Sequence, residues 1–77
     1  MANMWTEFIE MEAVRIVERG YPGYQEERRL VACMQEMKDQ LDPLAYNRFR
    51  KEVLRSAHSR YMIERIVENA EESLGLI

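Results

Sequence analysis

The sequence predicts an all-α protein: a single domain over residues 1–77 that forms a small bundle of three or four helices. Apolar residues recur at spacings of three and four along most of the chain, which is the period of an amphipathic helix. Three glycines and two prolines leave few turns, so the elements must be long and few, which disfavours an all-β fold. A domain this small is only marginally stable unless it packs well or self-associates.

The first helix is expected over about residues 4–19, with Asn3 as its N-cap and Gly20 able to adopt the left-handed conformation that ends a helix. It carries two apolar strips. The strip expected to face the core contains Trp5, Ile9, Ala13, Ile16 and Val17, with Phe8 at its edge. A second strip, on nearly the opposite side, contains Met4, Met11 and Val14. Because a helix with two apolar sides needs two neighbours, the second strip predicts an oligomer interface.

The second and third helices follow the clearest turn and the clearest helix start of the chain. The turn is Tyr21-Pro22-Gly23, and it precedes a helix expected over about residues 24–40. The apolar face of that helix is formed by Leu30, Cys33, Met34, Met37 and Leu41. The third helix is expected over about residues 43–57, because Asp42 can cap its free N–H groups and Pro43 suits its first position.

A fourth helix is expected over about residues 60–74, but no glycine or proline separates it from the third. The apolar stripe turns by around 100° on a helical wheel between Ala57 and Met62. Either the chain breaks near His58-Ser59, with Ser59 capping the fourth helix, or one helix of about 45 Å runs through. The break is slightly favoured, because the overhang of so long a helix would need a second subunit to cover it. The residues of the turned stripe, Ile63, Ile66, Val67 and Ala70, are therefore counted with the expected oligomer interface.

Charge is unevenly distributed along the chain. Residues 44–61 contain five basic residues and one acidic residue, whereas the whole chain has a net charge of −3. The basic residues that are expected to contact a partner are Arg48, Arg50, Lys51, Arg55, His58 and Arg60. Such a row could contact an acidic protein or, as the alternative, the phosphates of a nucleic acid bound to the helix at 43–58. It could equally be an ordinary solvated helix face.

No residue pattern predicts catalysis, a metal or a cofactor. Cys33 and His58 could in principle form a nucleophile and its base, but no third group or oxyanion donor is identifiable, and Cys33 lies on an apolar face. One His and one Cys exclude the usual zinc spacings, and the chain has no Gly-rich phosphate loop. We therefore expect no enzyme activity, no cofactor and no small-molecule substrate.

The function expected from the sequence is that of a small protein–protein interaction module, such as a regulator, inhibitor or assembly factor, that self-associates. A single cysteine fits a reducing compartment. No apolar run approaches the roughly 20 residues that a membrane-spanning helix needs, and no signal peptide is evident. We therefore expect a cytoplasmic protein with no membrane contact, whose partner is a second copy or another protein.

Overall fold

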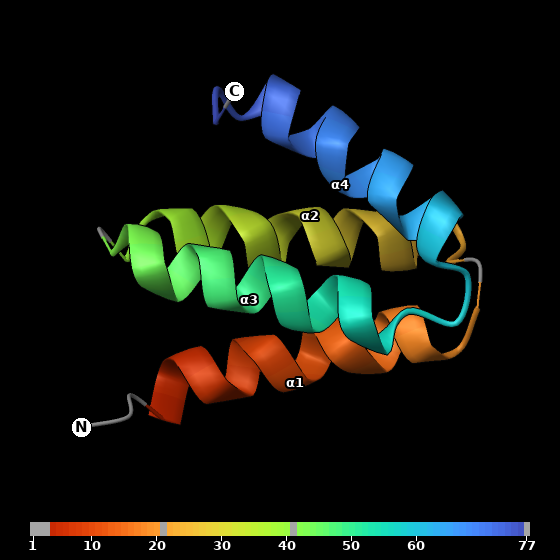
Figure 1. The fold of residues 1–77 in the computed structure, drawn as a ribbon, viewed down its shortest axis with the longest axis horizontal. Coiled ribbons are helices and arrows are strands. Elements are labelled where there is room, and N and C mark those ends of the chain that lie inside the picture. Colours follow the sequence, from red (N-terminus) through yellow and green to blue (C-terminus); the bar gives the residue numbers. More distant parts are fainter. Residues whose placement is uncertain (1–3, 21, 41, 77) are drawn as a thin grey trace.

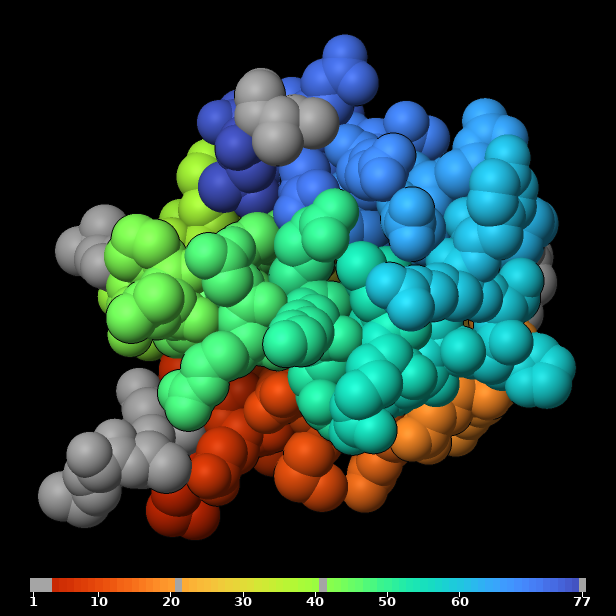
Figure 2. Space-filling view, viewed as in Figure 1, coloured from red at the N-terminus to blue at the C-terminus, as the bar shows by residue number. Residues whose placement is uncertain are grey.

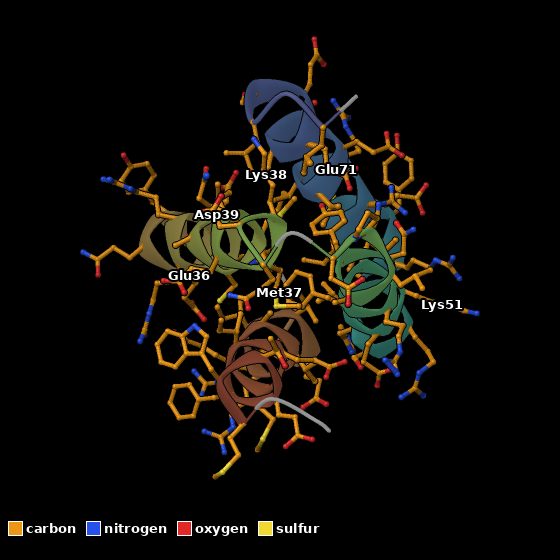
Figure 3. All side chains as sticks on the ribbon, turned by 90° about the vertical axis from the view of Figure 1, so that its left-hand side faces the viewer. Glu36, Met37, Lys38, Asp39, Lys51 and Glu71 are labelled. Atoms are coloured by element: carbon orange, nitrogen blue, oxygen red, sulfur yellow. The ribbon has the colours of Figure 1, made fainter. Side chains whose placement is uncertain are left out.

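The computed structural model describes residues 4–20, 22–40 and 42–76, and this part of the chain is all-α. Its helices are α1 (Met4–Glu18), α2 (Tyr24–Lys38), α3 (Pro43–Ser56) and α4 (Arg60–Ser73). The prediction of a helical bundle is confirmed, and each helix ends one or two residues earlier than the sequence predicts. Helices α1, α2 and α3 lie side by side, whereas α4 crosses them at a steeper angle (Figure 1). Viewed end-on, α1 and α4 lie on opposite sides of the pair formed by α2 and α3 (Figure 3).

The helix ends that the structure describes follow the capping signals of the sequence. The Asp42 side chain accepts a hydrogen bond from the Leu44 N–H at 3.0 Å, and Pro43 occupies the first helical position of α3. Gly20, just beyond α1, has a φ of 115°, which lies in the left-handed region that favours glycine. The predicted Asn3 cap, and the roles given to Tyr21 and Leu41, fall outside the described residues.

The chain breaks between α3 and α4, as the turned apolar stripe indicates. Helix α3 ends at Ser56, and α4 begins at Arg60. The backbone N–H of His58 donates to the carbonyl of Val17 at 3.1 Å, which ties this connection to the last turn of α1. Ser59 occupies the N-cap position of α4, but its side chain makes no capping hydrogen bond. Its carbonyl instead accepts the first helical bond, from the N–H of Ile63 at 3.1 Å.

The core lies between all four helices. Its largest fully buried side chains are Leu30, Met34, Ile63, Val17 and Val53, and Met37 points into the centre of the bundle (Figure 3). The stripe of α4 is part of this core: Ile63, Ile66, Val67 and Ala70 are all buried within the chain. Their assignment to an oligomer interface is therefore corrected. The physical reason is the break, which lets α4 fold back and cover its own apolar face against α2 and α3.

A buried carboxylate fixes α4 to α3. Glu71 is only 4 % exposed and is the one buried charged side chain among the described residues. Its Oε2 accepts from the Tyr46 hydroxyl at 2.7 Å and from the Arg50 Nε at 2.8 Å, and it points between the two helices in Figure 3. Burial, and then the hydrogen bond to Glu71, raise the pKa of Tyr46, so its hydroxyl stays protonated and donates. Arg50 thus forms an ion pair that joins α3 to α4, while its side chain remains 33 % exposed, and its assignment to a partner-binding surface stays a prediction.

The C-terminus of α4 is held by a second polar contact. Lys38 Nζ, at the end of α2, donates to the carbonyl of Leu74 at 2.5 Å, and a cation at this position suits the negative end of the helix dipole. Gly75 has a φ of 77°. Its N–H donates to the backbone carbonyl of Glu72, and the N–H of Leu76 donates to the backbone carbonyl of Glu71. This is the pattern of a Schellman motif, and it confirms that Gly75 ends the last helix.

Truncation of Arg50 should destabilise the fold through Glu71. Arg50→Ala leaves a buried carboxylate without its cation, and we expect it to lower the free energy of unfolding by about 2–3 kcal/mol. The loss is smaller than for a fully buried pair because the Arg50 side chain is 33 % exposed. Urea unfolding followed by circular dichroism at 222 nm measures it. Lys51→Ala, at the next and fully solvent-directed position, is the control, and an equal loss in both variants would contradict the assignment.

Candidate protein-binding surface

Helix α1 presents large apolar side chains to solvent. Met4, Trp5, Phe8 and Met11 are 83 %, 53 %, 63 % and 55 % exposed, and together we call them the α1 strip. They make up half of the large exposed hydrophobic residues in the described part of the chain; the others, Tyr24, Leu44, Tyr61 and Met62, are spread over three helices. Residues at i, i+4 and i+7 share one helix face, so Met4, Phe8 and Met11 form a continuous patch.

The α1 strip differs from the strip predicted by the sequence. Met4 and Met11 are exposed as expected, but Val14 is only half-exposed and lines the hollow between α1 and α3. Trp5, which was expected in the core, lies at the surface, and Phe8 is exposed rather than at the edge of the core. The indole Nε1 of Trp5 donates to Glu36 Oε2 at 3.2 Å, which keeps this ring at the surface between α1 and α2. The surface is therefore more aromatic than the sequence predicts.

The two aromatic rings of the α1 strip are ordered against each other. The Trp5 and Phe8 rings stack with their centroids 6.3 Å apart and their planes within 9°. Together with the hydrogen bond from Trp5 to Glu36, this stacking restrains the side chains before any partner arrives. Restrained aromatic side chains lose little conformational entropy on binding, which favours their use as anchors.

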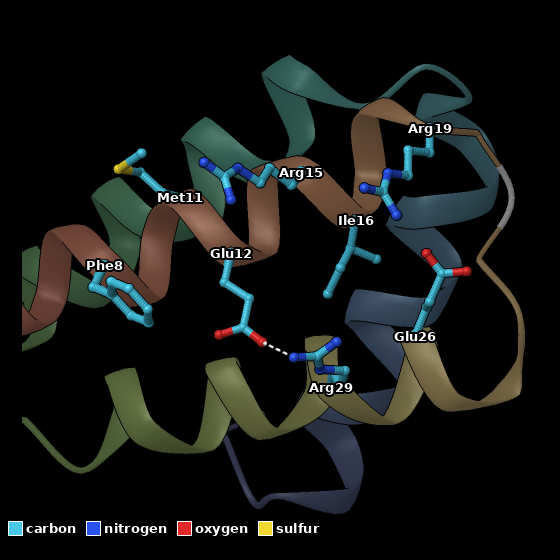
Figure 4. A pocket seen from close by; sticks show the side chains of 8 residues that line it. All are labelled: Phe8, Met11, Glu12, Arg15, Ile16, Arg19, Glu26 and Arg29. Atoms are coloured by element: carbon cyan, nitrogen blue, oxygen red, sulfur yellow. Dashed lines mark ion pairs between the residues drawn. The ribbon is translucent and has the colours of Figure 1, made fainter.

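A groove runs beside the α1 strip, between α1 and α2. Its larger hollow, of about 420 Å³, lies next to Phe8 and Met11, and the ion pair between Glu12 and Arg29, at 3.2 Å, crosses it (Figure 4). A second hollow of about 230 Å³ extends the groove toward Trp5 and Glu36. The residues lining the larger hollow are Phe8, Met11, Glu12, Arg15, Ile16, Arg19, Glu26 and Arg29.

The end of the groove nearest the C-terminus of α1 is basic. Arg15 and Arg19 are exposed there, and neither forms an ion pair with any residue that the structure describes. An aromatic and methionine-rich patch bordered by arginines has the composition of protein interfaces, in which these residue types are enriched. The face of α1 therefore has an apolar N-terminal half and a charged C-terminal half, which carries Arg15, Glu18 and Arg19.

Two of the four basic residues of α3 are paired within the chain, and so is Arg60 at the start of α4. Arg50 forms an ion pair with Glu71, Arg55 with Glu52, and Arg60 with Glu64 at 3.8 Å.

The other basic residues of the predicted row face solvent or a weaker neighbour. Burial raises the pKa of Glu10, and Arg48 lies close enough to that carboxyl to offset part of the rise. Lys51 points away from the bundle (Figure 3), and His58 is exposed in the connection before α4. Figure 2 shows this side of the molecule, with α3 across its middle. Three of the six basic residues that the sequence predicts to contact a partner are therefore paired with acidic residues of the same chain.

The structure brings Cys33 and His58 into no common site. The Cys33 thiol is buried in the core, and burial, followed by Glu12 and Glu36, raises its pKa to about 11. His58 is exposed beyond the end of α3.

Within the described ranges there is no group of three or more potential metal ligands. None of the described helices has the length and apolar character required to cross a bilayer.

Native Cys33 should resist alkylation. With its pKa near 11 rather than the usual 9.0, the thiolate fraction at pH 8 is about 100-fold lower than in the unfolded chain, and burial hinders access further. We expect iodoacetamide labelling, measured by mass spectrometry, to be at least about 100-fold slower in the native protein than in urea. Because the folded pKa is the higher one, the contribution of Cys33 to stability is complete below about pH 9 and is lost toward pH 11. Equal labelling rates in both states would contradict the burial of this thiol.

Glu10 should be a site where removing a charge stabilises the fold. Burial, and then the Glu52 carboxylate across the α1–α3 contact, raise the pKa of Glu10. Its contribution to stability is therefore full below its ordinary pKa of 4.5 and is lost as the pH rises through the folded value. Glu10→Gln should raise the free energy of unfolding at pH 7 by less than about 1 kcal/mol. Repeating the urea titration at a pH below the ordinary pKa is the control, since the gain should disappear there.

Known proteins give no lead to the role of the α1 strip. No protein-family model, no curated protein and no solved structure matches the chain. The exposure, charge and groove geometry of the described residues are therefore the grounds on which a function can be inferred.

Proposed function

We propose that the protein acts by binding another protein, and that the α1 strip is its binding surface. The observation that carries this proposal is the concentration of four large, more than half-exposed apolar side chains on one helix. Each square ångström of apolar surface removed from water contributes roughly 25 cal/mol, so leaving these side chains exposed forgoes a considerable stabilisation. Exposed apolar patches of this kind mark interaction sites on small proteins.

The surroundings of the α1 strip support protein binding in particular. Helix-in-groove recognition uses apolar anchors at i, i+4 and i+7, which is the spacing of Met4, Phe8 and Met11. The adjoining groove, together with Arg15 and Arg19, which form no ion pair among the described residues, can supply the polar rim that surrounds the apolar centre of an interface. The proposal includes no catalytic step, cofactor or small-molecule substrate. We place this activity in the cytoplasm, because the single, buried thiol suits a reducing compartment.

Nucleic-acid binding through α3 has weaker support. Arg48, Lys51 and Arg55 share one exposed face, which is the arrangement needed to contact successive phosphates. Arg55, however, is paired with Glu52, and Glu10 lies near Arg48. The net charge of −3 also works against association with a polyanion. We therefore keep α3 as the rival surface and favour α1.

A position-specific photo-crosslink tests the proposal. Benzoyl-phenylalanine in place of Phe8 should give one discrete protein adduct on irradiation of the cells that make the protein. The physical reason is that a bound partner holds a C–H bond against the probe. The same probe in place of Tyr24, which is 73 % exposed on α2, is the matched control and should give little adduct. The adducts are resolved by electrophoresis and identified by mass spectrometry.

Two outcomes would contradict the proposal. Equal yields from positions 8 and 24 would show that the α1 strip has no preference for a partner. A discrete adduct that forms only when the probe replaces Lys51 on α3, and that contains nucleic acid, would favour the rival surface.

A further inference from the structure

We propose that the partner of the α1 strip is a second copy of this chain, and that the two α1 helices pair antiparallel about a two-fold axis near Met11. The inference rests on the proposed function and makes it specific, because it names the occupant of the surface and the orientation in which it binds. It is argued from the exposed area of the strip and from the distribution of charge along α1.

The apolar area is sufficient for a dimer. Large side chains of this kind carry roughly 150–250 Å² each. With exposed fractions between 53 % and 83 %, the four residues of the α1 strip leave on the order of 500 Å² open on each copy. Pairing two strips therefore covers at most on the order of 1,000 Å², which is the lower limit for a specific interface, and the flanking charged residues add to it.

The charges on α1 favour the antiparallel orientation. The apolar strip occupies the N-terminal half of the helix, whereas Arg15 and Arg19 lie on its C-terminal half. A parallel pair would place these arginines against their own counterparts, and like charges in contact are unfavourable. An antiparallel pair instead separates the like charges, because it brings Glu7 of each copy opposite Arg15 of the other and leaves Glu18 opposite Met4 at the rim.

The two-fold axis near Met11 gives the arginines specific neighbours. Glu7 and Arg15 are each four residues, about 6 Å along the helix, from Met11. They therefore come opposite one another in the two copies and can form two equivalent ion pairs. Arg19 reaches the end of the partner helix that carries the Trp5 ring, where a guanidinium can lie over the indole. Such an interface uses the same patch on both copies, as closed dimers do.

No other exposed residue on the described surface offers an equivalent pairing. Tyr24 and Leu44 are exposed singly on α2 and α3, and the consecutive residues Tyr61 and Met62 of α4 do not share a helix face, so they form no strip. Helix α4 packs on α2 and α3, on the side of the molecule away from α1 (Figure 3). It therefore does not obstruct the outer face of α1.

Analytical ultracentrifugation of the full chain over a wide range of micromolar concentrations is the first test. The wild-type protein should be a dimer. The double variant Phe8→Ser with Met11→Ser should raise the dissociation constant at least about 100-fold, because it removes the central anchors from both copies. The matched control is Tyr24→Ser with Leu44→Ser, which removes two equally exposed apolar side chains from α2 and α3 and should leave the dimer intact. Circular dichroism confirms that each variant is folded.

Charge reversal and disulfide trapping test the orientation. Glu7→Arg and Arg15→Glu should each weaken the dimer, and the two changes combined should restore it. In the antiparallel pair, position 4 of one copy lies opposite position 18 of the other, whereas the two positions 4 lie about 21 Å apart. Oxidation of a mixture of Met4→Cys and Glu18→Cys proteins should therefore give a mixed disulfide, and Met4→Cys alone should give none. The native Cys33 can remain, because its thiol is buried.

The outcomes separate this inference from the proposed function. A monomer at every concentration, a dimer that survives the Phe8 and Met11 changes, or rapid crosslinking of Met4→Cys alone would each overturn the antiparallel pair. If the photo-crosslink at position 8 then identifies a different protein, the proposed function is supported and the dimer is excluded. An adduct of twice the chain mass supports both, and no adduct at position 8 removes both.

Discussion

The packing of the molecule depends on the reversal of the chain between Ala57 and Ser59. Without it, the third and fourth helices would form one rod, and the apolar residues of its second half would have no cover from their own chain. The reversal is anchored by the hydrogen bond from the His58 N–H to the Val17 carbonyl, which joins the connection to the end of α1. Once α4 folds back, Ile63 and its neighbours complete the core with α2 and α3. One short break thus converts a potential oligomer interface into the interior of the monomer.

Polar contacts also hold α4 in position on α2 and α3. Glu71 meets Tyr46 and Arg50 at defined distances, and Lys38 meets the last turn of α4. A buried ion pair is weak support for stability, since the cost of removing both charges from water offsets much of their attraction. The pair nevertheless restricts how α4 can lie, because any arrangement that left the buried Glu71 carboxylate without a partner would cost free energy. Together the two contacts select one crossing angle from the many that apolar packing alone would tolerate.

The uncovered face of α1 lies away from α4. In a regular up-and-down four-helix bundle the fourth helix packs beside the first. Here α4 lies on the opposite side of the α2–α3 pair, so α1 has two neighbours and one uncovered face (Figure 3). That face carries the stacked Trp5 and Phe8 rings and two methionines, and it borders the groove with the unpaired arginines. The proposed binding surface thus lies on the side of the α2–α3 pair away from α4 (Figure 3).

The sequence by itself determined the helices and their ends. Asp42-Pro43, Gly20 and Gly75 act through local backbone geometry, which needs no tertiary contact, and the turned stripe after Ala57 indicated the break. Only the tertiary structure decided which neighbour each face meets. Periodicity places Trp5 beside Ile9, but the indole is at the surface because its N–H bonds to Glu36 of another helix. Arg50 and Lys51 are adjacent in a basic segment, yet Arg50 is paired within the chain because Glu71, twenty-one residues later, accepts from its Nε. A helical period specifies which residues share a face, whereas long-range packing specifies whether that face meets protein or water.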